Sequence, residues 1–160
     1  MLFKSCEMDF QRSQSYLDDY NYINNLYNKK NINNEERVML NVYLSGEIHT
    51  DWRDEIINLC QKEGLDINFS SPVTNHELSD NCGVEILGAE ENNYWKDNKG
   101  AKINSMRTKK SIEDSDVVIV KFGEKYKQWN AAFDAGYASA LNKSIIEIHS
   151  DDHQHPLKEV

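Results

Sequence analysis

The four consecutive residues Val117-Val118-Ile119-Val120 are all apolar and β-branched. Such residues favour strands, and an apolar run without alternation is typical of a strand that is covered on both faces. This stretch therefore predicts a buried strand of a parallel sheet. The segments on either side of it indicate which kind of sheet contains the strand.

Strand-like and helix-like segments alternate along the chain from about residue 39. Further strands are predicted at 39–44, 66–69 and 144–148, and helices at 52–63, 98–115 and 129–141. Residues 73–83 are predicted as a polar loop that precedes a short helical patch at 84–87. The inner side of the helix at 98–115 is predicted to carry Ile103, Met106, Lys110 and Ile112. This alternation is the repeat of an α/β fold with a parallel sheet and right-handed crossovers.

The start of the chain differs in composition from the rest. The first 37 residues contain seven Asn residues but no Gly and no Pro. We therefore divide the chain into an Asn-rich N-terminal extension at 1–38 and one domain at 39–160. A helical stripe formed by Tyr16, Tyr20, Ile23 and Tyr27 leaves two interpretations, a loosely attached helix with a linker or an added helix that covers the domain or a subunit interface.

Charge and composition exclude several classes of protein. The formal net charge of −9 argues against a partner that is a nucleic acid polymer or an anionic membrane surface. No apolar run approaches the ~20 residues that cross a bilayer, and the N-terminus lacks the apolar region of a secretory signal. The three cysteines include no CxxC pair. These features are expected of a cytoplasmic protein without a disulfide framework.

In open α/β sheets, ligands bind beyond the carboxyl ends of the strands. This rule selects the loops at 45–53, 70–83 and 122–134. The first loop contains the substrate-binding candidates Gly46, Glu47, His49, Asp51 and Arg53. Its glycine allows close approach of a ligand, and the following helix offers free N–H groups to an anion. A turn with a helix cap would explain Thr50 and Asp51 alone, but not Glu47, His49 and Arg53 together. Neither the GxxxxGK[ST] nor the GxGxxG motif is present.

Asp134 lies in an Ala-rich helix beside Ala131, Ala135 and Ala138. Carboxylates are seldom buried without a partner or a purpose. One interpretation is a pocket carboxylate that acts as a nucleophile at a sugar anomeric carbon or as a general base. The other is an Asp that points to solvent or bonds a nearby backbone group.

Other residues are weaker candidates. His76 and Asp80 lie either over the site or in a polar surface loop. Trp129, next to Asn130, could stack on a base or sugar or pack in the core. Arg107 suits a phosphate or carboxylate ligand, or pairs with Glu113. His149, His153 and His155 have a spacing that can hold zinc, but a solvated tail is the preferred interpretation. We therefore predict neither a metal nor a cofactor.

Four segments carry a resemblance to a known family. They are YLSGEIHTDWR at 43–53, NFSSPVTNHELSDNCGVEILG at 68–88, DVVIVKFGEKYKQWNAAFDAGYASALNKSI at 116–145 and HPLKE at 155–159. Together they resemble the YtoQ-type proteins, which in turn look like relatives of nucleoside 2-deoxyribosyltransferases. The resemblance covers about residues 39–160, and the third segment is the most specific.

The resemblance implies a flavodoxin-like, doubly wound parallel sheet of about four to five strands and a homo-oligomeric enzyme. Its substrate would be a small-molecule (deoxy)nucleoside or nucleotide, whose N-glycosidic bond is transferred or hydrolysed. By resemblance, Asp134 would be the catalytic nucleophile and Tyr43 would orient it by a hydrogen bond. The loop after the third predicted strand, with Gly123, Trp129 and Asn130, would line the sugar site.

The chain also departs from the family pattern. Asp134 stands where the transferases have Glu, and Asn130-Ala131 replaces their Gly-Thr. Arg107-Thr108 stands where relatives place an acidic group that recognises the base. These departures keep an alternative open, in which the chain is a non-catalytic protein that binds a nucleotide-like ligand.

Overall fold

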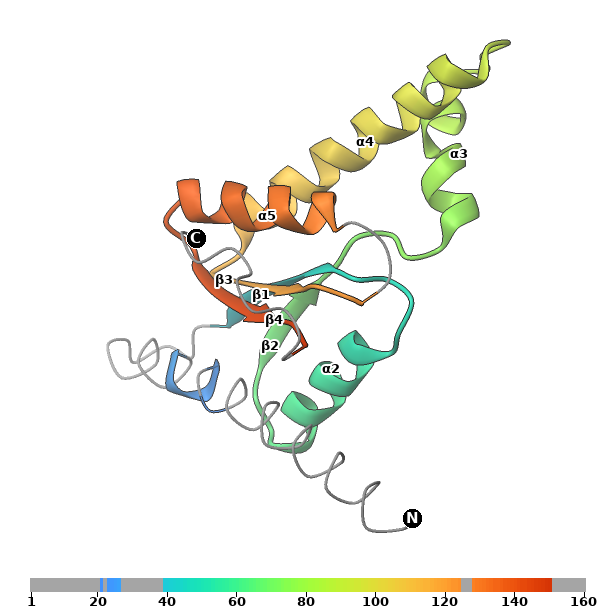
Figure 1. Cartoon of the computed structure of the whole chain (residues 1–160). Coiled ribbons are helices and arrows are strands. Elements are labelled where there is room, and N and C mark those ends of the chain that lie inside the picture. The colour runs from blue at the N-terminus through green and yellow to red at the C-terminus, as the bar shows by residue number, and fades with distance from the viewer. Residues whose placement is uncertain (1–20, 22, 27–38, 125–127, 151–160) are drawn as a thin grey trace. The chain divides into compact units, whose positions relative to one another are not determined.

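The structure is a computed structural model that describes residues 21, 23–26, 39–124 and 128–150 (Figure 1). The predicted extension at 1–38 falls largely outside these residues, as do Tyr16, Tyr20 and Tyr27 of its stripe. The chain divides into two compact units. The larger unit contains residues 41–50 and everything described from 69 onward. The smaller unit contains the described residues up to 40 and residues 51–68.

The described strands form one four-stranded parallel sheet. Its strands are β1 (Leu40–Gly46), β2 (Ile67–Ser70), β3 (Val117–Lys121) and β4 (Ser144–Ile148), in the order β2-β1-β3-β4. This is the strand order of flavodoxin-like, doubly wound sheets. β2 lies on one side of β1, and β3 and β4 lie on the other side. The order in which strands are added to the sheet therefore reverses between β1 and β3. The predicted α/β fold class is confirmed.

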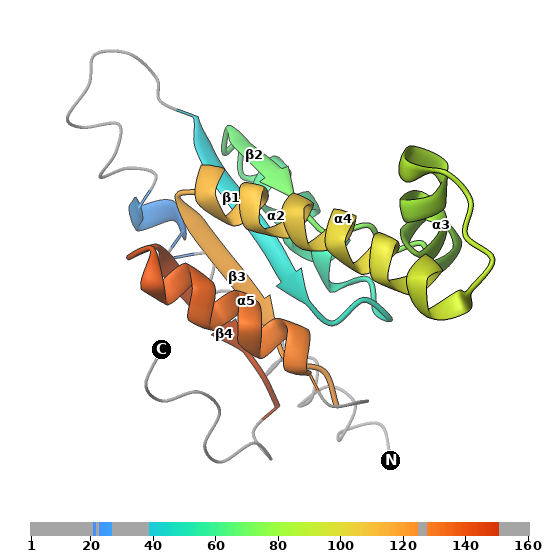
Figure 2. The same ribbon diagram turned by 90° about the horizontal axis from the view of Figure 1, so that it is seen from above.

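β3 supplies the centre of the core in the larger unit. Its first four residues, Val117 to Val120, are each no more than 1% exposed. Helix α5 (Trp129–Ala140) packs against β3, β4 and α4 (Asn93–Asp114), as Figure 2 shows. The packed cluster consists of Tyr43, Ile112, Val118, Val120, Ala131, Ala135 and Ala138. The small alanine side chains allow α5 to approach the sheet closely, which places the first turns of this helix near the ends of the strands.

Helix α2 (Trp52–Lys62) belongs to the smaller unit and matches the predicted helix. Its buried residues are Trp52, Arg53, Ile56 and Cys60. The guanidinium carbon of Arg53 lies 4.6 Å from the centre of the Trp52 ring, a cation–π contact. Burial raises the pKa of the Cys60 thiol to about 11.

The predicted loop at 73–83 is wrong over most of its length, because helix α3 (His76–Leu87) begins within it. Asn75 caps this helix by accepting a hydrogen bond from the backbone N–H of Leu78 at 3.0 Å. Gly83, at which the predicted loop ends, lies inside α3 and lets this helix touch α4. A Cβ atom on Gly83 would lie 2.3 Å from the backbone nitrogen of Gly100.

Helix α4 starts at Asn93, five residues earlier than predicted, and Asn92 caps it. Ile103 and Ile112 are buried as expected, but Met106 is 59% exposed and Lys110 is exposed as well. The predicted inner side is therefore wrong in part. Within the described residues, no helix combines the length and the hydrophobicity that a membrane span requires.

A substitution at Gly46 tests how closely β1 and β3 approach each other. Its φ is +97°, and an added Cβ would lie 2.1 Å from the carbonyl oxygen of Lys121. Gly46→Ala is expected to lower the free energy of unfolding by about 3 kcal/mol or more, through left-handed strain and overpacking. Gly64→Ala is the matched control, because its φ is +70° with no atom within 4 Å of an added Cβ. It should cost only about 1–2 kcal/mol. Urea titrations of both variants measure the difference, and equal losses would contradict the close approach.

Candidate functional site

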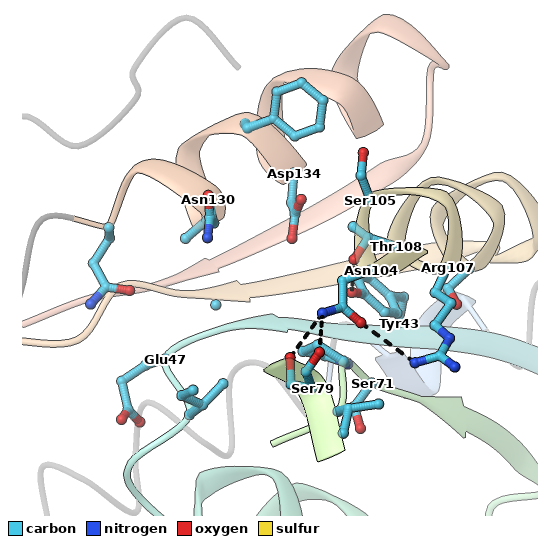
Figure 3. A pocket seen from close by; sticks show the side chains of 18 of the residues that line it. Tyr43, Glu47, Ser71, Ser79, Asn104, Ser105, Arg107, Thr108, Asn130 and Asp134 are labelled. Carbon is cyan, nitrogen blue, oxygen red and sulfur yellow. Dashed lines mark hydrogen bonds between the residues drawn. The ribbon is translucent and has the colours of Figure 1, made fainter. Parts of the chain in front are cut away.

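A pocket of about 620 Å³ lies at the carboxyl ends of the strands, and all of its lining residues belong to the larger unit (Figure 3). Residues 46–49 follow β1, residues 71–73 follow β2, and residues 128–134 begin α5. Helix α4 contributes a further wall. The pocket therefore receives residues from all three loops that the sequence selects, beside the point where the strand order reverses.

Asp134 lies on the buried face of α5 and is 8% exposed. Its Oδ2 atom accepts a hydrogen bond from the hydroxyl of Ser45 at 2.5 Å. Burial raises the pKa of Asp134 to about 6, although the Ser45 hydrogen bond acts in the opposite direction. Of the two interpretations of Asp134, the structure thus places the carboxylate in the pocket rather than toward bulk solvent. It is ionised at neutral pH and more basic than an ordinary Asp.

Tyr43 also lines the pocket, from the buried part of β1. Its hydroxyl donates to Oγ1 of Thr108 on α4 at 3.4 Å. The hydrogen bond that reaches Asp134 in the structure comes from Ser45, two residues further along the same face of β1. The orienting role that the family resemblance gives to Tyr43 stays a prediction.

Glu47 is a second buried carboxylate, and it is 6% exposed. It accepts hydrogen bonds from the Thr50 hydroxyl at 2.5 Å and from the backbone N–H of His49. Burial alone would raise the pKa of Glu47, but these hydrogen bonds and the charge of Lys121 outweigh burial and hold it below its ordinary value. Its side chain also packs on Gly123, where an added Cβ would lie 2.3 Å from Cγ of Glu47. Glu47 is therefore a charged group, and its contacts with His49, Thr50 and Gly123 stabilise the loop after β1.

Small residues on one side of α4, all but one of them polar, form a wall of the pocket that the sequence analysis did not predict. The residues are Ala101, Asn104, Ser105, Thr108 and Ser111. Their spacing of three or four residues is that of a helical stripe, and this spacing is the signal in the sequence that indicates the wall. The pocket-lining residues Ser71, Ser79, Gln128 and Phe133 were missed too, as was Ser45.

The structure brings eight of the thirteen predicted site residues to the pocket lining. These are Tyr43, Gly46, Glu47, His49, Arg107, Trp129, Asn130 and Asp134. His76, Asp80 and Gly123 lie outside the lining, although the His76 ring stacks on His49 with 6.0 Å between the ring centres. Asp51 and Arg53 belong to the smaller unit. Trp129 is 73% exposed, so it does not pack in the core.

Two alternatives for charged residues can be compared with the structure. Arg107 contacts Oδ1 of Asn104 at 3.5 Å, while Glu113 accepts a hydrogen bond from Tyr137 instead. In the described part of the chain, no three His, Cys, Asp or Glu side chains gather where they could hold a metal ion. His153 and His155 of the considered zinc pattern lie outside that part.

The raised pKa of Asp134 makes stability depend on pH. The Asp134 carboxyl has a pKa of about 6 in the folded state and an ordinary pKa of 3.8 in the unfolded chain, so the folded state binds the proton more tightly. The stability that this proton contributes is fully present below pH 3.8 and is lost as the pH rises through about 6. Asp134→Asn should therefore be more stable than the wild type above pH 6, by roughly 2 kcal/mol, and similar to it near pH 4. Thermal unfolding at both pH values measures the difference. Asp97→Asn, an exposed change on α4, is the control, and an Asp134→Asn effect independent of pH would contradict the assignment.

Comparison with known proteins agrees with the geometry. A family model described as nucleoside 2-deoxyribosyltransferase YtoQ matches residues 43–160. A relative from Bacillus subtilis (strain 168), named "Uncharacterized protein YtoQ", is 49% identical over 119 residues, which cover 74% of this chain and 80% of that protein. The matched residues include the pocket from Tyr43 to Asp134. The chain therefore belongs to the nucleoside 2-deoxyribosyltransferase YtoQ family.

Proposed function

We propose that this chain is an enzyme that transfers or hydrolyses the N-glycosidic bond of a (deoxy)nucleoside or nucleotide, with Asp134 as the nucleophile. The observation that carries the proposal is a buried carboxylate in a pocket at the carboxyl ends of the strands. Ser45 holds its Oδ2 atom, so Oδ1 is the oxygen left for a substrate among the described residues. Membership of the family supports the same chemistry.

The proposed reaction has two steps. In the first, a carboxylate oxygen of Asp134 forms a bond to C1′ of the sugar while the C1′–N bond breaks. The base leaves with the electron pair of that bond and takes up a proton. In the second step, the nitrogen of another base or the oxygen of water attacks C1′, loses its proton and releases the carboxylate. A carboxylate that is ionised at neutral pH and unusually basic suits the first step.

Other pocket residues have roles that follow from their positions. Ser45 acts as a positioning residue, because its hydrogen bond fixes the carboxylate, and by resemblance Tyr43 assists it. Trp129 and Asn130, at the start of α5, would contact the sugar or base, and an exposed Trp ring provides an apolar face for stacking. Gly46, Glu47 and His49 would bound the site from the loop after β1. His76 stacks on His49 and would support that loop.

Binding without turnover is the second candidate. Asp134 is one methylene shorter than the Glu of the better-known transferases, and attack at C1′ tolerates little error in position. The same pocket would then bind a nucleotide-like ligand that stays intact. The proposal also includes a cytoplasmic location, which the cysteines and the N-terminal sequence suggested, and a homo-oligomer, which the family resemblance suggested.

Removal of the nucleophile separates the two candidates. Asp134→Asn should lower the rate of base release by about 10³-fold or more, because no carboxylate remains to attack C1′. The assay incubates the full chain with deoxynucleosides and their 5′-monophosphates, with and without an acceptor base, and follows the free base by chromatography. Acid-quenched wild-type protein should also carry the added mass of the sugar. Asp97→Asn should match the wild type. Base release that survives in Asp134→Asn would refute the mechanism, and no release by the wild type from any substrate would favour binding alone.

The role of Ser45 is visible in the pH profile. Activity should fall as the pH drops below about 6, since Asp134 must be ionised to attack. In Ser45→Ala the carboxylate loses a hydrogen bond to its charged form, so this acidic limb of kcat/KM should move upward by roughly one pH unit. A structural role for Ser45 alone would lower the rate at every pH and leave the limb in place. A limb that does not move therefore contradicts the positioning role.

A further inference from the structure

The two ends of the pocket differ in chemistry. Glu47 and Arg107 lie far apart in Figure 3, and Asp134 lies between them in that view. Asp134 and Glu47 are the two carboxylates of the lining, whereas Arg107 lies among hydroxyl and amide groups. We call this second group, formed by Ser71, Ser79, Asn104, Arg107 and Thr108, the α4 end of the pocket. Its chemistry favours an anionic ligand over a neutral one.

Arg107 has no carboxylate partner among the described residues. Its guanidinium donates one long hydrogen bond, at 3.5 Å from Nη1 to Oδ1 of Asn104. The side chain is exposed to the pocket and to solvent. An arginine without an acidic partner is notable in a chain with a net charge of −9. A planar guanidinium can donate two parallel hydrogen bonds to a phosphate or carboxylate.

The hydrogen-bond network around Arg107 leaves hydroxyl protons available to a ligand. The Asn104 amide donates to the Ser79 hydroxyl oxygen at 2.9 Å and to the Ser79 carbonyl oxygen at 3.1 Å. The Tyr43 hydroxyl donates to the Thr108 hydroxyl oxygen at 3.4 Å. Ser79 and Thr108 thus act as acceptors toward the protein, so their own O–H groups can donate into the pocket.

Several donors in different directions suit a phosphate better than a carboxylate. A phosphate monoester presents three oxygens in a tetrahedral arrangement, and a single arginine fork satisfies at most two of them. The hydroxyl groups of Ser79 and Thr108 are then available for the remaining oxygen. A planar carboxylate has only two oxygens, and a bidentate arginine contacts both, so it offers no further oxygen to these hydroxyl groups.

We propose that the α4 end of the pocket binds the phosphate of a nucleoside 5′-monophosphate, so that nucleotides rather than free nucleosides are the substrates. The inference rests on the proposed function, because it assumes a sugar with C1′ at Asp134. A 5′-phosphate is attached to that same sugar. Asp134 and Arg107 line one pocket of about 620 Å³, and the inference requires that a single nucleotide contact both.

The test measures binding in full-length Asp134→Asn, which keeps the ligands intact. Calorimetry at fixed ionic strength compares deoxyadenosine, deoxyguanosine, deoxycytidine and thymidine with their 5′-monophosphates. The best monophosphate should bind at least about tenfold more tightly than its nucleoside. Adding Arg107→Gln should abolish this preference, because it weakens binding of the monophosphate far more than binding of the nucleoside. Lys102→Gln, an exposed cation on α4 outside the pocket lining, should retain the preference.

Four results would overturn the inference. They are equal binding of nucleosides and monophosphates, absence of monophosphate binding, equal weakening of both ligands by Arg107→Gln, and loss of the preference in Lys102→Gln. Two further probes distinguish other sources of the anion. Orotidine, whose base carries a carboxylate, would overturn the phosphate assignment if it bound as tightly as the best monophosphate. Inorganic phosphate of equal affinity would overturn the link to a nucleoside, whereas weak competition that needs Arg107 would support the inference.

Failure of this inference is distinguishable from failure of the proposed function. A preference for monophosphates that depends on Arg107, together with no base release by the wild type, would refute the reaction and keep the phosphate subsite. Base release that depends on Asp134 but is equally fast from nucleosides and monophosphates would keep the reaction and refute the subsite.

Discussion

The position of the site depends on the parallel pairing of β1 with β3. The register runs from Val42 opposite Val117 to Gly46 opposite Lys121. Because side chains alternate along a strand, this register puts Tyr43 and Ser45 on the same face of the sheet. Tyr43 belongs to the cluster that includes the alanines of α5, and Ser45 reaches Asp134 on that helix. Beyond Gly46, the backbone N–H of Glu47 donates to the Lys121 carbonyl and ties the following loop to β3.

The parts of the fold that could be predicted are those whose signal is local. Four β-branched residues in a row identify β3, and an Asp in an Ala-rich helix identifies Asp134 as unusual. The Ser45 contact could not be predicted in the same way, since 89 positions in the sequence separate it from Asp134. Helix α3 was missed because Gly83 resembles a helix breaker when its contact with Gly100 is unknown. The polar wall of α4 was missed because small polar side chains are also typical of an exposed surface.

Glu47 and Asp134 show how the same functional group acquires two characters in one pocket. Both are buried, and burial disfavours the charged form of each. Glu47 receives donors from Thr50 and His49, which compensate for lost water and lower its pKa. Asp134 accepts a hydrogen bond from one hydroxyl, which does not compensate for its burial, so its pKa is raised. Local donors and the charge of Lys121, rather than depth alone, therefore separate a carboxylate with a lowered pKa from one with a raised pKa.

The exposure of Trp129 gives the molecule an optical property. The chain has three tryptophans, and each has a different environment: Trp52 is buried in the smaller unit, Trp95 is exposed on the first turn of α4, and Trp129 borders the pocket. Indole fluorescence responds to the polarity and the stacking of its surroundings. Occupancy of the pocket is therefore expected to change the emission of Trp129, which would serve as a native spectroscopic reporter.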